Sequence, residues 1–250
     1  MKTELILGFL VVLLAAVWMI LLSLRKQRGA GQAVFRRIPA IARLRGAVGL
    51  SVEDGSRVHV SLGNGDLNDA ANPSALAGLD ALHRVGQLSA TSDQPPVCTS
   101  GNGGFAVLSK DVLSQAARET NTLDAYDPDH GYLSGVTPLA YTLGAMEVMS
   151  EPGVKTNVFT GSFGPEAGFL TTASEERGAF TLAGSESIIA QSVFMATARD
   201  VILGEELYVL PAYLVQRASY IASLKVQDFL RILLGGALVI GALLKLAGIL

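Results

Sequence analysis

The stretch VFTGSFGPEAG (residues 158–168) changes from an extended pattern to a helical one within a few residues. It starts with β-branched and aromatic side chains, passes through glycine, serine and proline, and then continues into a helix-forming run. Junctions of similar shape recur at VCTSGNGGFAV and FTLAGSESIIA. A strand that leads through a glycine-rich turn into a helix, repeated along a chain, is typical of an α/β fold with a parallel sheet.

The two ends of the chain are more apolar than its middle. LILGFLVVLLAAVWMILLSL (residues 5–24) holds 20 residues without a charge, which matches the roughly 20 residues that a helix needs to cross a bilayer. ILLGGALVIGALLKLAGIL (residues 232–250) is interrupted only by Lys245. We therefore predict transmembrane helices at both ends. A cleaved signal peptide is the alternative for the first segment, and a buried core helix is the alternative for the second.

A basic stem follows the first apolar segment, over residues 25–47. It contains no acidic residue and seven cations: Arg25, Lys26, Arg28, Arg36, Arg37, Arg43 and Arg45. Short basic segments stay on the cytoplasmic side of a membrane. We therefore expect a two-pass protein of the inner membrane with a cytoplasmic middle, whose basic stem faces anionic lipid. A solvated linker is an equal alternative for this stem.

The rest of the chain is acidic, since residues 46–250 carry 11 basic and 21 acidic side chains. Neutralising the phosphates of a nucleic acid needs a cationic surface, so nucleic acid is not an expected partner. Cys98 is the one cysteine, so no intrachain disulfide can form. This cysteine content fits a cytoplasmic location.

Between the stem and the last apolar segment, residues 48–215 alternate short β-rich runs with longer helix-like ones. Strands are predicted over residues 57–62, 95–100, 155–160, 178–183 and 206–211. Helices are predicted over residues 73–89, 105–119, 137–150, 165–176 and 185–202, with a connecting helix over residues 216–231. This order predicts a single Rossmann-like domain with a largely parallel sheet, flanked by the two transmembrane helices.

Glycine-rich loops follow four of the predicted strands. In an open parallel sheet these loops lie on one edge, where ligands bind. The candidate ligand-binding residues are Ser100, Gly101, Gly103, Ser162, Gly164, Ser185 and Ser187. Helix capping at Gly164 and Ser185 is the favoured alternative, because it needs no ligand. The loops contain no Lys or Arg, and Asp66, Glu166 and Glu186 would repel a phosphate.

Catalytic and cofactor motifs are incomplete. GNGGFA (residues 101–106) fits a relaxed dinucleotide fingerprint, but Asp124, the acidic residue at the required separation, falls in a predicted loop. Cys98 could act as a nucleophile with His59 or His130, although an inert buried thiol is the commoner case. DAYDPDHGY (residues 124–132) offers oxygen ligands without the spacing of a calcium loop. We therefore assign no catalytic residue, metal or cofactor.

Two segments carry a family resemblance. AFTLAGSESIIAQSVFMATARDVILGEELYVLPAYL (residues 179–214), together with FTGSFGPEAG (residues 159–168), resembles an uncharacterised family of bacterial membrane-anchored proteins recorded only as a domain of unknown function. The resemblance covers most of the central domain. It implies a membrane-tethered α/β module, and it brings no activity and no catalytic residues.

Two functions from different classes fit this sequence. The first is a non-enzymatic structural protein that self-associates into a homo-oligomer at the cytoplasmic membrane face, with membrane lipids as its other partners. Small residues on apolar faces, including the step from Ala237 to Gly241, favour close packing between helices. A monomer whose small residues fill its own core is the alternative. The second function is binding, with or without hydrolysis, of a nucleotide, small molecule or metal at the glycine-rich loops.

Overall fold

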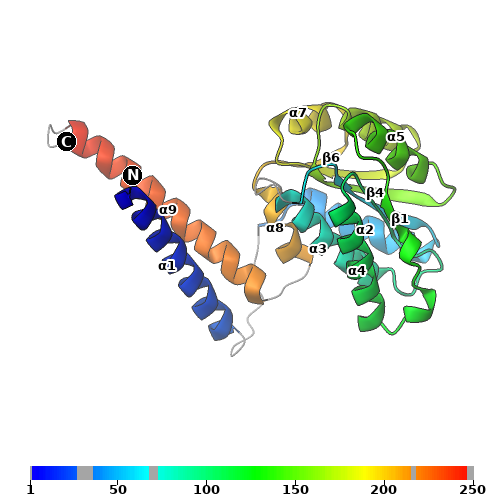
Figure 1. Cartoon of the computed structure of the whole chain (residues 1–250), viewed down its shortest axis with the longest axis horizontal. Coiled ribbons are helices and arrows are strands. Elements are labelled where there is room, and N and C mark those ends of the chain that lie inside the picture. The colour runs from blue at the N-terminus through cyan, green and yellow to red at the C-terminus, as the bar shows by residue number, and fades with distance from the viewer. Residues whose placement is uncertain (1, 27–35, 68–72, 215–217, 247–250) are drawn as a thin grey trace. The chain divides into compact units, whose positions relative to one another are not determined.

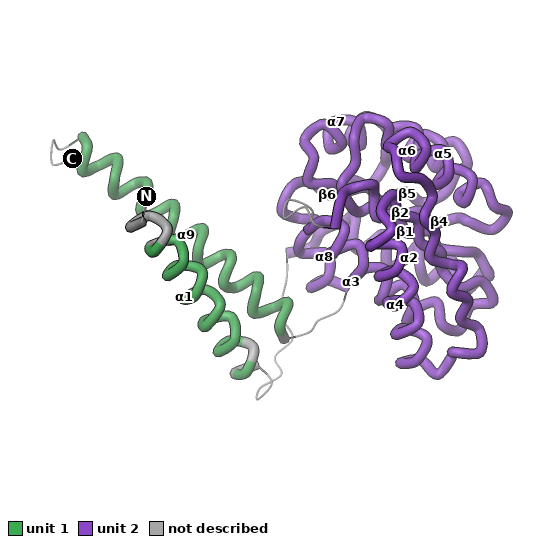
Figure 2. The backbone as a smooth tube through the Cα atoms, viewed as in Figure 1, with its two compact units in different colours: residues 1–35, 215–250 green, residues 36–214 purple. Residues whose placement is uncertain are grey.

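The computed structural model describes residues 2–26, 36–67, 73–214 and 218–246. The chain divides into two compact units (Figure 2). One unit comprises Arg36–Leu214, and the other combines Met1–Phe35 with Val215–Leu250. The larger unit therefore begins earlier in the chain than the domain expected from the sequence over residues 48–215.

The larger unit is built on an all-parallel sheet with the strand order β3-β2-β1-β4-β5-β6. The strands are β1 (Arg57–Gly63), β2 (Val97–Ser100), β3 (Gly131–Leu133), β4 (Val154–Ser162), β5 (Phe180–Gly184) and β6 (Asp200–Ile202). This is the strand order of doubly wound dinucleotide-binding folds, so the predicted α/β class and parallel sheet are confirmed. The chain order reverses between β1 and β4, which lie side by side at the centre of the sheet.

Helices cover both faces of this sheet (Figure 1). One face carries α2 (Pro39–Glu53), α3 (Pro73–Leu88), α4 (Gly103–Glu119) and α8 (Glu206–Leu214). The other face carries α5 (Pro138–Met149), α6 (Ala167–Glu176) and α7 (Ile188–Thr197). Two short 3₁₀ turns, Leu123–Ala125 and Pro128–His130, lead into β3.

The core beneath α5, α6 and α7 contains a group of aromatic side chains. Tyr141, Phe159, Phe163 and Phe194 are buried together there. The rings of Phe163 and Phe194 meet edge to face, with centroids 5.6 Å apart and planes at 73°. Such pairs add about 0.5–1.5 kcal/mol beyond the burial of their area. These contacts hold the helical layer over the centre of the sheet.

Helix α2 is formed by residues that the sequence places partly in the basic stem. Its N-cap residue Ile38 and its helical residues Ile41, Leu44 and Val48 are buried in the larger unit. They recur at the spacing of one helix face. The apolar stripe of the stem therefore packs on protein, within the α/β unit, where the sequence suggested either a lipid interface or a solvated linker.

The seven basic residues of the predicted stem are divided between the two units. Four of them, Arg36, Arg37, Arg43 and Arg45, belong to the α/β unit and are exposed. Arg25 and Lys26 are the last residues of α1 (Lys2–Lys26), and Arg28 lies outside the described residues.

The end of the α/β unit differs from the sequence-based expectation. The strand predicted over residues 206–211 is wrong, because these residues lie in α8. Leu207, Leu210 and Leu214 are buried there, at helical and not alternating spacing. The helix predicted over residues 185–202 ends before β6, which is an edge strand of three residues. Strand β3, also three residues long, has no predicted counterpart.

The second unit contains α1 and α9 (Ala218–Leu246). Trp18 of α1 packs on Phe229 of α9, with ring centroids 4.2 Å apart. Among the described residues, Ser219–Leu246 is the one helix long and apolar enough to cross a membrane, whereas the N-terminal apolar stretch Gly8–Leu22 is shorter than this criterion requires. Length and composition thus agree with the transmembrane helix expected near the C-terminus. They do not identify a transmembrane helix over residues 5–24.

The close approach of β1 and β4 generates the first testable prediction. A Cβ added at Gly161 would lie 1.9 Å from the Leu62 carbonyl oxygen. Relief of this clash requires the two central strands to separate. We expect Gly161→Ala to lower the free energy of unfolding by about 3 kcal/mol, at the upper end of overpacking effects, in denaturant titrations of the full chain in detergent.

Gly46→Ala in α2 is the matched control. No heavy atom lies within 4 Å of a Cβ at Gly46, and alanine favours a helix over glycine by about 1 kcal/mol. This variant should be slightly more stable than the natural chain. Equal stabilities of the two alanine variants would contradict the strand packing.

Candidate functional site

The carboxyl ends of β1, β2, β4 and β5 lie next to one another, because these strands are neighbours in a parallel sheet. The four glycine-rich loops begin at these ends. In doubly wound sheets, ligands bind at this edge, in the crevice where the strand order reverses. Here that position lies between the ends of β1 and β4.

Neighbouring backbone occupies the space that glycines leave at this reversal. Gly63 has a φ of +74°, and a Cβ there would lie 2.2 Å from the Ser162 carbonyl oxygen. A Cβ at Gly101 would lie 2.4 Å from the Cβ of Asn64. The Asn64 N–H donates to the Ser162 carbonyl at 3.1 Å, and the Gly101 N–H donates to the Gly63 carbonyl at 2.8 Å. The glycines therefore allow the loops after β1, β2 and β4 to contact one another.

The predicted site residues near β2 begin helix α4. The buried Ser100 hydroxyl donates to the Asn102 carbonyl at 3.1 Å. Asn102 is the N-cap of α4, and its side-chain oxygen accepts from the Gly104 N–H at 2.8 Å. Gly103 is the first residue of α4, and a Cβ there would have no heavy atom within 4 Å. Of the three predicted residues at this strand, Gly103 is the one that faces open space.

The predicted site residues after β4 and β5 lie just before helices α6 and α7, and Ser187 alone among them is an N-cap. The Gly164 N–H donates to the Glu166 carboxylate at 3.0 Å. Ser187 is the N-cap of α7, and its hydroxyl oxygen accepts from the Ala190 N–H at 3.4 Å. The buried Ser185 hydroxyl oxygen accepts from the Ser187 N–H at 3.2 Å. The sequence predicts capping at Gly164 and Ser185, but the N-cap residues are Glu166, which makes no side-chain capping hydrogen bond, and Ser187. The predicted caps therefore lie two residues before the observed ones.

A chain of hydrogen-bonded polar side chains crosses the buried sheet face beneath α5 and α6. His59 Nε2 lies 2.8 Å from the Thr99 hydroxyl, and His59 Nδ1 lies 3.0 Å from Asn157 Oδ1. The Asn157 amide nitrogen donates to the Ser174 hydroxyl at 2.8 Å, and Ser174 lies 2.7 Å from the Thr181 hydroxyl. All of these residues are buried. Sequence reasoning missed this chain, although a histidine inside an apolar strand was a signal for it.

The hydrogen bonds fix where the protons lie in this chain. Because the Asn157 amide nitrogen donates to Ser174, the Asn157 carbonyl oxygen faces His59, whose Nδ1 must carry a hydrogen. His59 Nε2 then accepts from the Thr99 hydroxyl. Burial lowers the pKa of His59 to about 4. His59 is therefore neutral at pH 7 with both nitrogens occupied, which suits a structural role better than acid–base chemistry.

Tyr141 of α5 holds the end of β1. Its hydroxyl hydrogen-bonds the Ser61 hydroxyl and accepts from the Gly63 N–H at 3.1 Å. Burial raises the pKa of Tyr141, so its phenol is neutral at pH 7. The contact fixes α5 against the point where the strand order reverses.

The nucleophile pair considered from the sequence does not form. Cys98 is in register with Val60, the residue after His59, so Cys98 and His59 point to opposite faces of the sheet. Burial raises the pKa of the Cys98 thiol to about 12. The acidic segment after α4 forms a turn, in which the Asp129 N–H donates to Asp127 at 2.8 Å. Within the described part of the chain, no cluster of His, Cys, Asp and Glu could hold a metal ion.

Burial of neutral His59 makes the stability of the fold depend on pH. The pKa is about 4 in the folded chain, compared with 6.5 for an ordinary histidine. The stabilisation is therefore complete above pH 6.5 and is lost as the pH falls towards 4. One pKa unit corresponds to about 1.4 kcal/mol, so we expect a loss of about 3 kcal/mol over this range, measured by urea unfolding.

His59→Gln removes this titration. The variant should be less stable at every pH, because it disrupts the buried chain, but its decline between pH 6.5 and 4 should be smaller by about 3 kcal/mol. His130→Gln is the comparison variant: burial also lowers the pKa of His130, on the half-buried turn before β3, but His59 is fully buried, so His130→Gln should change the pH dependence less than His59→Gln does. If the natural chain and His59→Gln lose the same stability between pH 6.5 and 4, His59 is not buried in its neutral form.

Comparison with protein families gives a match over nearly the whole chain. Residues 2–250 match the family model described as "Domain of unknown function (DUF6754)". No curated protein and no solved structure matches the chain. The resemblance to an uncharacterised family is confirmed, and the match covers the terminal helices as well as the α/β unit.

Proposed function

Because the chain belongs to the family of this domain of unknown function, we propose its function from its own surfaces: it is a membrane-anchored α/β protein that associates with further copies of itself. We place the α/β unit at the cytoplasmic face of the membrane, without a catalytic role. The observation that carries the proposal is the apolar outer surface of α5, α6 and α7.

This apolar outer layer consists of large side chains that the α/β unit leaves exposed. Exposed fractions are 80% for Ile188, 61% for Ile189, 62% for Phe169, and 58% for both Leu139 and Leu143. Helix α7 contains no charged residue along its ten residues. A helix that faces water normally carries a charged outer face. Neighbouring exposed apolar residues on packed helices mark an interaction site.

A second copy of the chain is the partner that fits this layer. Chains held in one membrane meet at a high effective concentration, so modest contacts are enough to associate them. The apolar helix α9 offers a further contact, since added Cβ atoms at Gly235, Gly236 and Gly241 would meet no heavy atom within 4 Å. Small residues allow close approach of helices inside a bilayer.

Helix α9 supports attachment to a membrane. The stretch Ser219–Leu246 holds 28 residues, and a helix of this length spans about 42 Å at 1.5 Å per residue. The hydrocarbon core of a bilayer is about 30 Å thick. After Arg231 no charge occurs until Lys245. Leucines of α9 that are exposed in the isolated chain, including Leu234 and Leu238, would be removed from water by the lipid tails.

Cysteine labelling tests the membrane arrangement in intact cells. Cys98 is buried with a raised pKa, so it should not react in the folded chain. We expect Thr91→Cys, at an exposed position of the α/β unit, to react with a membrane-impermeant maleimide only after permeabilisation. Lys2→Cys should react in intact cells, as the two-pass arrangement requires. Labelling of Thr91→Cys in intact cells would place the domain outside and refute the arrangement.

Charge introduced into the apolar outer layer should break self-association. We expect the natural chain, of 26.1 kDa, to show a multiple of this protein mass in detergent by light scattering. The double variant Leu143→Glu with Phe169→Glu should raise the dissociation constant at least tenfold, or about 1.4 kcal/mol, because two carboxylates must lose water on association.

The control places the same two charges on the opposite helical layer. Leu76 of α3 is 51% exposed and Val107 of α4 is 66% exposed, so Leu76→Glu with Val107→Glu adds equal charge at similar exposure. This control should associate like the natural chain. A single-chain mass for the natural protein, or equal loss in both double variants, would refute the apolar outer layer as the contact.

A further inference from the structure

A cavity of about 330 Å³ opens beside the start of α2 and strand β6. Its charged lining side chains are Arg36, Arg37, Arg43, Arg199, Asp200 and Glu206. We propose that this cavity, named here the arginine cavity, binds a phosphate group and that Arg37 and Arg199 hold it. The glycine-rich edge of the sheet takes no part in this binding.

Two of the four arginines are already neutralised by carboxylates. Arg43 Nε donates to Asp200 Oδ1 at 2.7 Å, and the Asp200 side chain is only 1% exposed. Arg36 forms an ion pair with Glu206. Four positive and two negative side chains leave the lining with a net charge of +2. The cavity therefore suits an anion that carries one or two negative charges.

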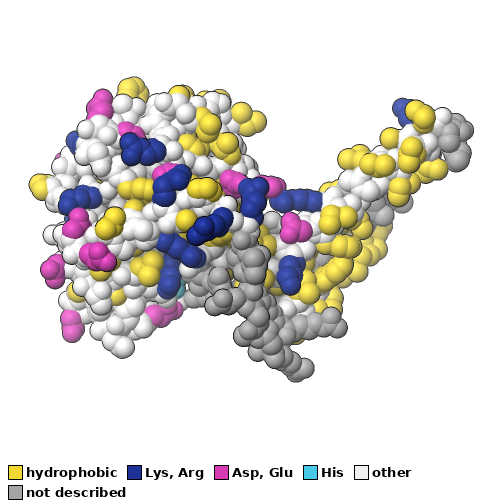
Figure 3. Space-filling view, turned by 180° about the vertical axis from the view of Figure 1, so that it is seen from behind, with side chains coloured by type: hydrophobic (Ala, Val, Ile, Leu, Met, Phe, Trp, Pro, Cys, Tyr) yellow, Lys and Arg dark blue, Asp and Glu magenta, His cyan; other side chains and the backbone are white. Residues whose placement is uncertain are grey.

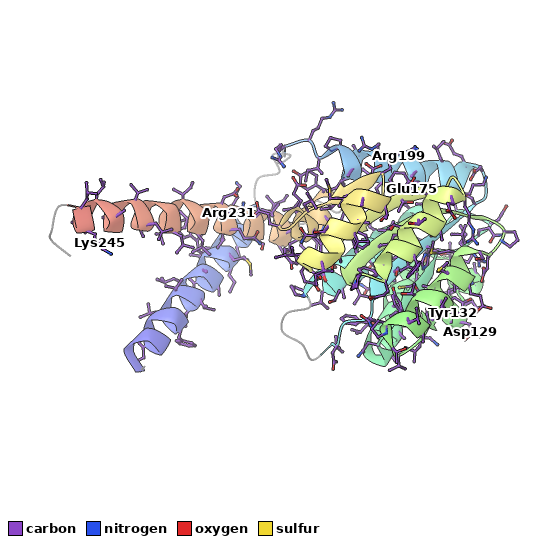
Figure 4. The ribbon with its side chains drawn as sticks, turned by 90° about the horizontal axis from the view of Figure 1, so that it is seen from above. Asp129, Tyr132, Glu175, Arg199, Arg231 and Lys245 are labelled. Atoms are coloured by element: carbon purple, nitrogen blue, oxygen red, sulfur yellow. The ribbon has the colours of Figure 1, made fainter. Side chains whose placement is uncertain are left out.

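Arg37 and Arg199 supply this excess charge. Both are exposed, and neither makes an ion pair with any residue in the described part of the chain. The backbone N–H of Arg199 donates to the Glu175 carboxylate at 2.9 Å, and Figure 4 labels these two residues near each other at the surface. Guanidinium groups bind phosphate oxygens through paired hydrogen bonds and stay charged at all relevant pH values.

The start of α2 adds to the positive potential of the arginine cavity. Ile38 is its N-cap and offers no side-chain acceptor, and Pro39 follows at the first turn of this 15-residue helix. Ile38, Pro39 and Ala40 all line the cavity. The positive end of the helix dipole therefore lies at the same place as the unpaired arginines. Figure 3 shows Lys and Arg side chains gathered on one face of the α/β unit.

The remaining lining is apolar. Met195, Ala198 and Val201, from the end of α7 and from β6, line the cavity together with the arginines. Met195 is 60% exposed. A phosphate attached to a short carbon chain thus finds cationic groups for its oxygens and an apolar wall for its carbons. This combination favours a phosphate ester over inorganic phosphate.

The position of the cavity in the chain points to a lipid headgroup as the source of the phosphate. Arg36 is the first residue of the α/β unit, and the Tyr213 hydroxyl donates to its carbonyl at 2.6 Å. The two ends of the α/β unit therefore lie together, beside the cavity that Arg36 lines. Ala218 starts the apolar helix α9 four residues after Leu214. The choice of a lipid source rests on the proposed membrane attachment, whereas phosphate binding does not.

The test uses the full chain in nonionic detergent at constant ionic strength. Glycerol phosphate is titrated in one arm, and dihexanoyl phosphatidic acid, a water-soluble lipid with the same phosphate ester, is titrated in the other. We expect both ligands to bind, and the double variant Arg37→Gln with Arg199→Gln to weaken both at least tenfold. Tighter binding of the lipid supports a headgroup as the source, and equal binding supports a free phosphate ester.

The control removes the same amount of charge from outside the cavity. Arg45 and Arg118 are exposed and do not line it, so Arg45→Gln with Arg118→Gln should change either affinity less than twofold. Arg43 is left intact, because its loss would leave buried Asp200 without a counter-charge. Unfolding midpoints close to that of the natural chain verify that both double variants fold.

Two results would overturn the proposal. One is that neither ligand binds the natural chain. The other is that both double variants lose affinity equally, which would mean that diffuse surface charge attracts the anion. The measurement requires neither a membrane nor a second copy of the chain. Its outcome is therefore independent of whether the protein self-associates or is anchored as proposed above.

Discussion

The pairing of β1 with β4 is the contact that sets the architecture of the α/β unit. The two strands run side by side from Arg57 and Val154 to Gly63 and Ser162. In dinucleotide-binding proteins of this strand order, glycines at the reversal admit a pyrophosphate. In this protein Gly63 and Gly101 admit the backbone of neighbouring loops. Glycine at this edge thus has two physical explanations, and only the neighbouring atoms distinguish them.

The same pairing explains why a polar chain can be buried in the centre of the sheet. Burying His59 and Asn157 without partners would cost several kcal/mol, but the register places them opposite each other. A slip of either strand by one residue would turn its own side chain, His59 or Asn157, to the other face and break the hydrogen bond between them. The chain from Thr99 to Thr181 therefore specifies the register of four neighbouring strands.

Much of this fold can be predicted from the sequence, and the exceptions have physical causes. Strands β1, β2, β4 and β5 lie close to their predicted positions, since each is a β-rich run bounded by turn residues. Strands β3 and β6 are too short to show alternation. The sequence of residues 206–211 is compatible with a strand or a helix. The segment is helical because this conformation buries Leu207 and Leu210 in the α/β unit.

The glycine-rich loops can be recognised from the sequence, whereas the arginine cavity cannot. Local rules place the helix starts after β4 and β5 at Gly164 and Ser185, two residues before the observed N-caps Glu166 and Ser187. Arg36 and Arg43 are conspicuous by charge, but their partners Glu206 and Asp200 lie 170 and 157 positions away. No local pattern connects such residues. The distinction between the paired arginines and the unpaired Arg37 therefore depends on tertiary structure.

The net charge of the whole chain and the local charge of a single cavity affect different kinds of ligand. Residues 46–250 carry ten more acidic than basic side chains, which disfavours a long polyanion that must contact much of the surface. Electrostatic interactions are screened over about 8 Å at physiological ionic strength, and a cavity of about 330 Å³ has a similar width. An anion inside it interacts mainly with the arginines and the start of α2. The acidic balance of the chain as a whole is therefore compatible with the proposed binding of a small phosphate ester at this one place.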